Sequence, residues 1–338
     1  MQEQEFQDYC EKLRNLIDAE LSAAFSADDC PEALRQAVQY SLTAPGKRLR
    51  PMLVLMAADV CGGTVEDGLP SACAVEMVHT YSLIHDDLPA MDDDSLRRGR
   101  PTSHVVYGEA LAILAGDTLL TRAFGTLTAS SLPPYVIAEC VRILSAAAGS
   151  GGMVGGQVLD LMAERGPFSV VSGQESQESP TQSRPFHRPP ADSKIMSGTE
   201  EIQEPSSGHL PGDVEQLIRI HRMKTGALIT ASLELGAVVA EADADQRSRL
   251  EQYGECCGLA FQIADDLLDV TGTGAKQGKE TGRDGTLGKL TYPSLLGIEG
   301  SRTKAAEQVE SACEALAEFG SKADPLRRLT RFIVERDH

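Results

Sequence analysis

Apolar residues recur at helical spacing along most of the chain. In long segments rich in alanine, leucine and glutamate they occupy positions i, i+3, i+4 and i+7, which is the pattern of one buried helix face. The expected helix ends coincide with proline and glycine residues, which interrupt helices. We expect helices at residues 2–25, 31–43, 50–61, 67–88, 105–129, 134–149, 151–164, 213–240, 244–272, 290–299, 303–319 and 324–335.

Signals for β-strands are nearly absent. Aromatic residues make up only 4% of the chain, tryptophan is missing, and no segment alternates β-branched and polar residues. Many helices with short connections bury their apolar faces against one another, as in a bundle. The pattern therefore predicts an all-α fold.

One segment, 166–212, breaks the helical pattern. It contains seven of the 17 prolines and nine serines, with few bulky apolar residues. Such a segment cannot bury enough apolar surface to offset its ordering entropy, so we expect a disordered loop. A linker between two domains is the alternative, but the motifs described below lie on both sides and need to meet in one site. We therefore expect a single domain over residues 1–338 with an insertion at 166–212.

The charge balance restricts the partners. The 338 residues include 50 acidic and 31 basic side chains, which gives a formal net charge of −19. This balance disfavours nucleic acid and anionic membranes, because phosphate groups attract basic surfaces. The N-terminus has no signal-peptide pattern, and we find no run of about 18 apolar residues. The eight cysteines form no C-x-x-C pair, and most lie in apolar helical segments, so we expect a reduced, cytoplasmic protein.

An acidic run ends the helix expected at 67–88. The sequence HDDLPAMDDD at residues 85–94 places five carboxylates within nine residues. Two such charges 4 Å apart repel by about 4 kcal/mol at a surface-like dielectric. A solvated acidic loop is the ordinary explanation of a charge run, and a metal site is the alternative.

A second acidic run lies inside an apolar helix, in FQIADDLLDV at residues 261–270. Asp265 and Asp269 are four residues apart, so they share a helix face and can direct oxygen atoms at one point. Aspartates are costly to bury without a partner, which argues for a function. Two separate clusters of oxygen ligands suit a hard cation such as Mg²⁺, which is usually held by a few carboxylates and by substrate phosphates.

Basic residues cluster near these aspartates although the protein is strongly acidic. They open the helix at 50–61, follow the first acidic run directly, interrupt the helix at 213–240 and flank a glycine-rich loop. Arginine forks and lysine charges are the groups that bind diphosphates, and simple salt bridges to the aspartates are the alternative. These residues are Lys47, Arg50, Arg97, Arg98, Lys224, Lys279 and Lys289.

Together the motifs resemble those of the short-chain trans-prenyl diphosphate synthases, in particular the bacterial-type farnesyl diphosphate synthases. The resemblance covers nearly the whole chain except 166–212. It implies an all-α bundle around a deep central cleft, usually in a homodimer, and a Mg²⁺-dependent condensation of isopentenyl diphosphate with dimethylallyl and geranyl diphosphate. It rests on GKRLRP at 46–51, EMVHTYSLIHDDLPAMDDDSLRRGRPTSH at 76–104, GDTLL at 116–120, GGQVLDL at 155–161, HRMKTGALI at 221–229, FQIADDLLDV at 261–270 and GKLTYP at 288–293.

The resemblance also implies roles for individual residues. Three ions are expected, Mg²⁺ or alternatively Mn²⁺, and neutral oxygen atoms are expected to face the allylic carbocation. The implied metal ligands are Asp86 and Asp92 for two ions, and Asp265 with Asp269 behind it for the third. The implied contacts are Arg97, Lys224 and Lys279 to the allylic diphosphate, Lys47, Arg50, His79 and Arg98 to isopentenyl diphosphate, and Lys289 to substrate. The implied catalytic residues are Lys224, Thr225 and Gln262.

Tyr81 is expected to set the length of the product. Helix periodicity puts it just over one turn before Asp86, on the side that points down the cleft. An aromatic residue there, with two extra residues in DDLPAMD relative to DDxxD, resembles farnesyl (C15) synthases. Geranylgeranyl (C20) relatives often have a smaller residue, and an ordinary core role for Tyr81 is the alternative.

Several rival functions are compatible with parts of this pattern. A geranylgeranyl diphosphate synthase would share the mechanism, a silent partner subunit would share the fold, and a terpene cyclase would share an aspartate-rich metal site but not GKRLRP. Glu76 and His79 also form an E-x-x-H pair, a di-iron signature whose second copy would be Glu335 and His338 at the polar chain end. The insertion at 166–212 is either a tolerated surface loop or a lid or partner-binding element.

Overall fold

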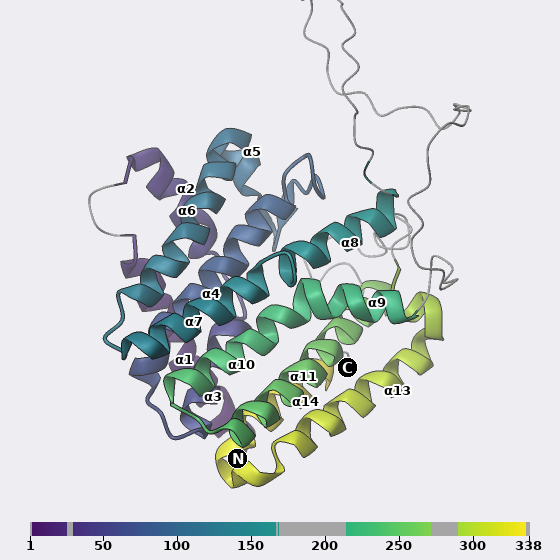
Figure 1. Cartoon of the computed structure of the whole chain (residues 1–338). Coiled ribbons are helices and arrows are strands. Elements are labelled where there is room, and N and C mark those ends of the chain that lie inside the picture. The colour runs from purple at the N-terminus through teal and green to yellow at the C-terminus, as the bar shows by residue number, and fades with distance from the viewer. Residues whose placement is uncertain (1, 26–29, 167, 169–213, 272–289, 336–338) are drawn as a thin grey trace, which may run out of the picture.

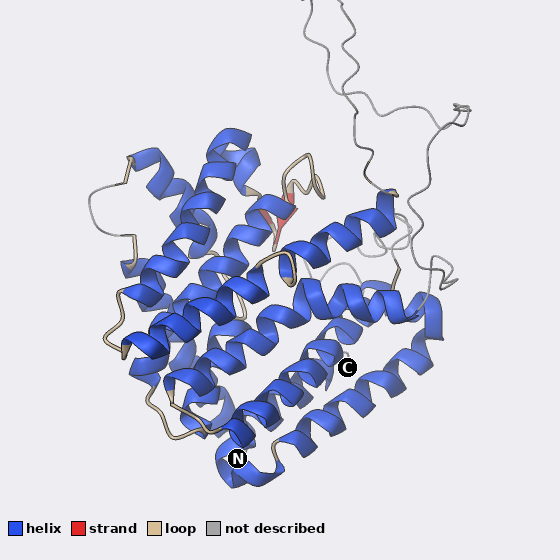
Figure 2. Ribbon diagram, in the orientation of Figure 1, coloured by secondary structure: helices blue, strands red, loops and turns tan. Residues whose placement is uncertain are grey.

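Helices form nearly all of the regular structure in the part of the chain that the structure describes (Figures 1 and 2). The computed structural model describes residues 2–25, 30–166, 168, 214–271 and 290–335. The first half contains α1 (Glu3–Ala23), α2 (Glu32–Leu42), α3 (Leu49–Val60), α4 (Val65–Asp86), β1 (Leu96–Arg97), β2 (Arg100–Pro101), α5 (Ser103–Tyr107), α6 (Glu109–Thr128), α7 (Pro134–Ala148) and α8 (Met153–Arg165). The second half contains α9 (Val214–His221), the π-helix η1 (Arg222–Gly226), α10 (Ala227–Val239), α11 (Ala244–Thr271), α13 (Tyr292–Ala315), the 3₁₀-helix η2 (Ala317–Ala323) and α14 (Asp324–Glu335).

The expected all-α fold is confirmed, with four local differences. The helix expected at 105–129 is interrupted at Gly108, whose φ of 81° ends α5. The two helices expected between 290 and 319 meet at a kink at Gly297, which has a φ of 70°. A five-residue π-helix, η1, interrupts the helix expected at 213–240. A two-residue antiparallel pair, β1 with β2, follows the first acidic run.

Helices α4 and α10 form the centre of the bundle. Helix α10 packs against α3, α4, α7 and α11, and ten of its 13 residues are buried. A helix that is apolar on all sides is stable only inside a protein, which explains the sequence ALITASLELGAVV. The apolar core that surrounds these helices extends from Phe6 to Ile333, so it draws on chain from both sides of residues 166–212. Most of the predicted insertion at 166–212, namely residues 167 and 169–212, lies outside the described residues and stays a prediction.

Two stretches have the length and mean hydropathy of a membrane span, although neither is a continuous apolar run. They are Glu109–Thr128, which is α6, and Pro134–Arg165, in which α7 and α8 are separated by turns at 149–152. Core helices of soluble proteins pass the same test, so the finding is weak evidence for a membrane. Only 33% of the apolar window of α6 is buried, so much of the apolar surface of this helix is exposed.

Candidate active site

A cavity of about 1180 Å³ lies within the bundle. Its walls come from the loop before α3 and from α4, the β1–β2 segment, α8, η1 and α11, so segments far apart in sequence meet there. Ligand pockets for single small molecules typically measure about 300–1,000 Å³, and this cavity is large enough for two small ligands. Among the predicted site residues it is lined by Lys47, Arg50, His79, Tyr81, Asp86, Arg97, Arg98, Lys224, Thr225, Gln262 and Asp265.

Two predicted site residues in the described part of the chain, Asp92 and Asp269, do not line this cavity, and two more predicted residues lie outside that part. Asp92 lies in the loop after α4, and its backbone N–H donates to the Asp86 carbonyl oxygen at 2.9 Å. Asp269 lies one turn after Asp265 on α11, and its Oδ2 is buried without a hydrogen-bond partner among the described residues. The other two, Lys279 and Lys289, lie outside the described residues, so their placement stays a prediction.

Helix α4 ends at the first acidic run, as the following proline predicts. Asp86 is its last residue, and the chain then turns back so that Asp92 reaches the helix end. Burial raises the pKa of Asp86 to about 6, which Lys224 and Arg97 oppose and Asp92 reinforces. A cation beside Asp86 would therefore favour its ionised form.

The carboxylates suit a divalent cation that is shared with a substrate. Within the described residues, no group of three or more acidic, histidine or cysteine side chains lies close enough to hold an ion by itself. Asp86 and Asp265 line the same cavity. The buried Oδ2 of Asp269 has no hydrogen-bond partner among the described residues. Mg²⁺ is commonly held by one or two carboxylates with phosphate oxygens and water completing its shell. Asp86, Asp92, Asp265 and Asp269 fit that arrangement.

Arg97 is fixed by a carboxylate that the sequence analysis did not assign. Its Nε donates to Asp87 Oδ1 at 2.7 Å, and its Nη2 lies 2.7 Å from the same oxygen and 3.9 Å from Asp94 Oδ2. Both aspartates are buried, so these pairs are only weakly screened by solvent. The salt-bridge explanation of the basic residues therefore holds for part of the Arg97 guanidinium, although Arg97 still lines the cavity.

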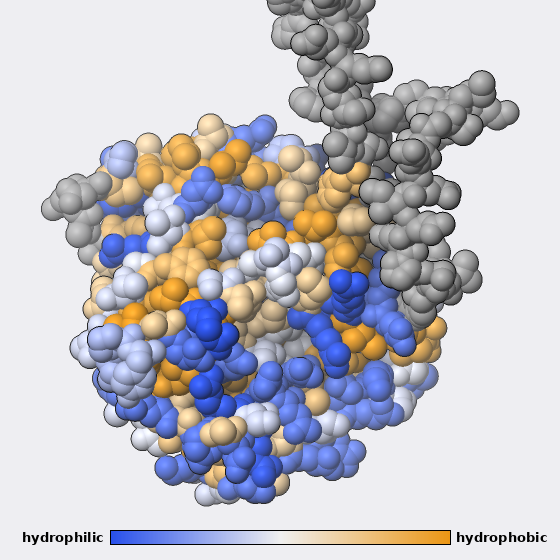
Figure 3. Space-filling view, in the orientation of Figure 1, coloured by the Kyte–Doolittle hydropathy of each residue, from blue (hydrophilic) through white to orange (hydrophobic). Residues whose placement is uncertain are grey.

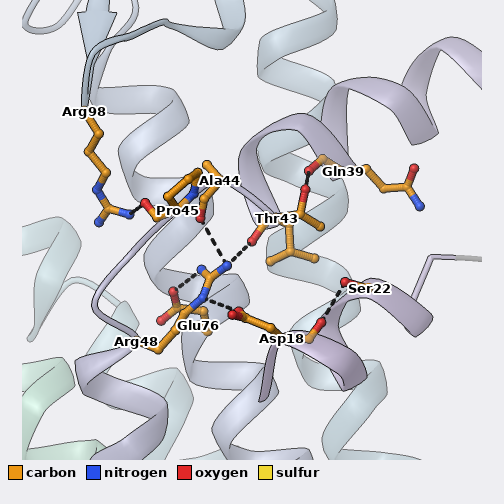
Figure 4. A network of polar contacts seen from close by, with 10 residues as sticks. Asp18, Ser22, Gln39, Thr43, Ala44, Pro45, Arg48, Glu76 and Arg98 are labelled. Carbon is orange, nitrogen blue, oxygen red and sulfur yellow. Dashed lines mark hydrogen bonds and ion pairs between the residues drawn. The ribbon is translucent and has the colours of Figure 1, made fainter. Parts of the chain in front are cut away.

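Arg48 organises the loop that carries Lys47 (Figure 4). Its guanidinium is buried between Glu76, at 2.7 Å, and Asp18, at 2.8 Å, and it donates to the carbonyl oxygens of Leu42 and Ala44. Arg48 has a φ of 49°, an unfavourable conformation for arginine that these four contacts maintain. Because Glu76 is paired with Arg48, it is not available for the di-iron site considered above.

Four cationic or titratable groups line the cavity, namely Lys47, Arg50, His79 and Arg98. Burial, with Arg50 and Arg98 nearby, holds the pKa of His79 well below its usual value, so the imidazole is neutral at pH 7. Burial also lowers the pKa of Arg50, which Glu76 opposes and Arg98 reinforces, and the Arg50 Nε has no hydrogen-bond partner among the described residues. An anionic ligand would relieve this repulsion, so the cluster is suited to a diphosphate.

The π-helix η1 presents Lys224 and Thr225 to the cavity. π-Helical turns are rare and often occur at functional sites, which agrees with this position. Lys224 Nζ donates to Asp160 Oδ2 on α8 at 2.5 Å, and the Thr225 hydroxyl donates to Gln262 Oε1 on α11 at 3.0 Å. The contact with α8 is close, because a Cβ on Gly156 would lie 2.2 Å from the Lys224 nitrogen.

The residues that hold the candidate side chains were not predicted from the sequence. Asp87 holds Arg97, Asp160 holds Lys224, Asp266 holds Gln262, and Arg48 holds the loop with Lys47. Each of the four lies inside a motif that was recognised, and proximity to an assigned residue was the available signal. What the sequence could not reveal is which way each side chain faces.

Comparisons with known proteins identify relatives of this chain. The family model described as "Polyprenyl synthetase" matches residues 31–178 and 196–325. A geranylgeranyl diphosphate synthase of Cyanophora paradoxa is 40% identical over 310 residues, which is 91% of this chain and 89% of that protein. A farnesyl diphosphate synthase of Bacillus subtilis is 39% identical over 329 residues, which is 96% of each chain.

The fold agrees as well. The crystal structure of an FPP/GFPP synthase from Zymomonas mobilis superposes with a TM-score of 0.76 at 34% identity, and the match covers 98% of this chain and 99% of that one. The expected family resemblance and the all-α fold are thus confirmed over nearly the full length of the chain. The chain belongs to the polyprenyl synthetase family, and within it to the short-chain trans-prenyl diphosphate synthases, which are trans-prenyltransferases.

Proposed function

We propose that the protein is a farnesyl diphosphate synthase, which condenses isopentenyl diphosphate with dimethylallyl diphosphate and then with geranyl diphosphate. The observation that carries the C15 product is Tyr81, which lines the cavity on α4 ahead of Asp86 and is only 6% exposed. Its ring packs edge-on against His85, with 5.7 Å between ring centroids, so the aromatic ring is held in the wall. Two farnesyl diphosphate synthases of Bacillus subtilis and Geobacillus stearothermophilus, 39% and 37% identical, support the same product.

A geranylgeranyl diphosphate synthase is the second candidate. It is favoured by the similarity to the Cyanophora paradoxa enzyme of that name, which is 40% identical to this chain. The two candidates differ in one condensation step, so they share every residue role except that of Tyr81.

The substrate contacts follow from the charges around the cavity. Lys47, Arg50 and Arg98 bind the diphosphate of isopentenyl diphosphate, with neutral His79 as a hydrogen-bonding partner. Arg97 and Lys224 bind the allylic diphosphate, each oriented by a carboxylate. Asp86, Asp92, Asp265 and Asp269 would hold Mg²⁺. The bound ions would neutralise the negative charge of the leaving diphosphate.

The reaction needs a neutral but polar surface beside the allylic carbon. The C–O bond of the allylic diphosphate breaks and its electron pair leaves with the diphosphate, which creates a carbocation. Oxygen atoms of Thr225 and Gln262 stabilise this cation without a full negative charge that could trap it. The isopentenyl double bond then forms the new C–C bond, and the released diphosphate takes the proton that is lost.

We also propose a homodimer in the cytoplasm. The dimer is supported by exposed apolar side chains on α5 and near the start of α6. Only 33% of the apolar window of α6 is buried. The cytoplasmic location rests on composition, because most of the eight cysteines lie in apolar helical segments, as reduced cysteines do.

The deciding experiment is a product analysis. The purified protein is incubated with isopentenyl diphosphate, dimethylallyl diphosphate and Mg²⁺, and the alcohols released by phosphatase are separated by chromatography. Farnesol as the main product supports the proposal, geranylgeraniol supports the second candidate, and the absence of any prenyl alcohol refutes both. Chelation of the metal abolishes turnover and added Mg²⁺ restores it if the metal assignment is correct.

Three variants test the carboxylates in the same assay. Asp86→Ala and Asp265→Ala each lower kcat by about two orders of magnitude or more while the helical circular dichroism spectrum stays the same. Asp93→Asn is the matched control, because Asp93 is exposed, belongs to the same acidic run and has a φ of 55° that asparagine tolerates. Normal turnover of either alanine variant contradicts the metal assignment.

A further inference from the structure

A chain of hydrogen bonds runs from the cavity into the core at α13. The Thr225 hydroxyl donates to Gln262 Oε1 at 3.0 Å, and Gln262 Nε2 donates to Asp266 Oδ1 at 3.0 Å. The other carboxylate oxygen, Asp266 Oδ2, accepts the backbone N–H of Tyr292 at 2.9 Å, at the start of α13. Asp266 is 5% exposed and Tyr292 is fully buried, so the inner end of this chain is shielded from water.

Asp266 and its neighbour Asp265 face different surroundings. Successive residues on an α-helix point about 100° apart, and Asp265 lines the cavity whereas Asp266 does not. Both oxygen atoms of Asp266 accept hydrogen bonds from protein groups. These two bonds give Asp266 a task that is distinct from metal binding.

An ionised carboxylate determines which way a neighbouring amide points. A carboxylate accepts hydrogen bonds but donates none, so only the NH₂ end of the Gln262 amide can face Asp266. The carbonyl end of the amide then faces Thr225, and both residues line the cavity. With the opposite orientation, two oxygen atoms would face each other at Asp266 and an NH₂ group would lie beside Thr225.

We propose that Asp266 is a positioning residue that keeps the carbonyl oxygen of Gln262, and not its NH₂ group, beside the developing carbocation. The inference rests on the proposed function and deepens it. The orientation of the Gln262 amide dipole affects the stability of the carbocation, because a carbonyl oxygen stabilises a cation and an NH₂ group destabilises it. Asp266 thus acts on the chemistry through Gln262 and contacts neither substrate nor reacting carbon.

The variant Asp266→Asn replaces an acceptor beside Gln262 with a side chain that can also donate. An asparagine that accepts from Tyr292 N–H presents its own NH₂ group to Gln262, which forces the Gln262 amide to flip. We expect kcat to fall by about two orders of magnitude. We expect the KM values for both diphosphates and the Mg²⁺ concentration at half-maximal rate to change by less than about threefold, since uniform binding is untouched. A rise in the Mg²⁺ requirement would instead make Asp266 a metal ligand and overturn the inference.

Thr291→Val controls for loosening of α13. Thr291 caps this helix by accepting from Ser294 N–H at 3.3 Å, next to the Tyr292 that Asp266 holds. This variant lowers the melting temperature but leaves kcat unchanged, because the Gln262–Asp266 bond remains. A fall in kcat equal to that of Asp266→Asn would show that α13, and not the Gln262 amide, mediates the effect.

A double-mutant cycle tests whether Asp266 acts through Gln262. Gln262→Met keeps the length of the side chain and removes the amide, so there is no dipole left to orient. In that background we expect Asp266→Asn to change kcat by less than about threefold, because the two positions are coupled. Independent, multiplicative effects on kcat overturn the inference.

Ligand binding provides a readout that does not require turnover. An allylic diphosphate analogue with a protonated amine at the reacting carbon resembles the carbocation, and a neutral carbon analogue of the same shape does not. We expect Asp266→Asn to weaken the amine analogue about tenfold more than the neutral one. Equal weakening of both analogues overturns the inference, whereas failure of the wild-type protein to bind either analogue refutes the proposed function itself.

Discussion

Tyr81 offers the most direct test at the scale of a single residue. Its ring occupies the cavity wall, so replacing it with alanine opens space for a longer prenyl tail. We expect Tyr81→Ala to shift the principal product from C15 to C20 or longer, measured by chromatography of the released alcohols. Tyr81→Phe is the control, because phenylalanine keeps the ring and should keep the C15 product. Farnesol as the main product of Tyr81→Ala would assign the residue to the ordinary core.

His221 links burial to the pH dependence of stability. Burial lowers its pKa to about 4, with Asp160 opposing and Lys224 reinforcing the shift, and its ring lies 5.6 Å from that of Tyr292. The unfolded chain, with an ordinary histidine pKa of about 6.5, binds the proton more readily between pH 6.5 and 4. Acidification through this window therefore costs roughly 3 kcal/mol of folding stability at this residue.

The variant His221→Leu isolates this contribution. Urea unfolding at pH 7 and at pH 4 gives the free energy of unfolding of both proteins, and the other titrating groups cancel in the difference. We expect the wild type to lose about 3 kcal/mol more than the variant on acidification. An identical loss in both proteins would show that His221 is not the group that titrates.

The contact between α8 and η1 shows how an element positions the chemistry. A Cβ at Gly156 would lie 2.2 Å from the nitrogen and 2.6 Å from the Cα of Lys224, which are backbone atoms that cannot move aside alone. We expect Gly156→Ala to push η1 away from α8, to break the Lys224–Asp160 pair and to lower kcat by about a hundredfold. The overpacking should also lower the free energy of unfolding by about 1–3 kcal/mol.

Gly125→Ala is the matched control on α6. A Cβ there meets no atom within 4 Å, and alanine is the better helix former. We expect unchanged kcat and a gain in stability of up to about 1 kcal/mol, measured by the same unfolding and steady-state assays. Normal kcat in Gly156→Ala would mean that the exact separation of α8 and η1 is unimportant for the reaction.

The same helices show what the sequence can and cannot predict. Apolar spacing identified most helices, because burial imposes a local periodicity on the sequence, and both acidic runs stand out by their aspartates. The π-helix η1 was not predicted, since a shift of one residue in backbone hydrogen bonding hardly alters that periodicity. The Lys224–Asp160 and Gln262–Asp266 bonds depend on side-chain direction, and the former joins residues 64 positions apart. The family resemblance implied which residues form the candidate site, and packing determines how these side chains are held.

At the scale of the whole molecule, apolar side chains are exposed on α5 and α6. The α5–α6 patch, defined as Val105, Val106, Ile113 and Leu114, has four large side chains that are each 43–53% exposed. Hydrophobic side chains gather on this part of the surface (Figure 3), and Ile113 also lines the cavity. Apolar patches of this kind on soluble proteins commonly mark interfaces, and homodimer interfaces are more apolar than the remaining surface.

The dimer prediction can be tested on this patch. Leu114→Glu places a charge where a dimer would exclude water, so we expect the protein to change from the dimer mass to the monomer mass of 36.1 kDa in light scattering after size exclusion. Leu296→Glu is the control and should leave the dimer intact, because Leu296 is 40% exposed and belongs to α13. In Figure 1, α13 and α6 lie on opposite sides of the bundle. Because Ile113 connects the patch to the cavity, monomerisation should also lower turnover. A wild-type protein that is monomeric, or a Leu114→Glu variant that remains dimeric, would assign the apolar surface of α6 another role.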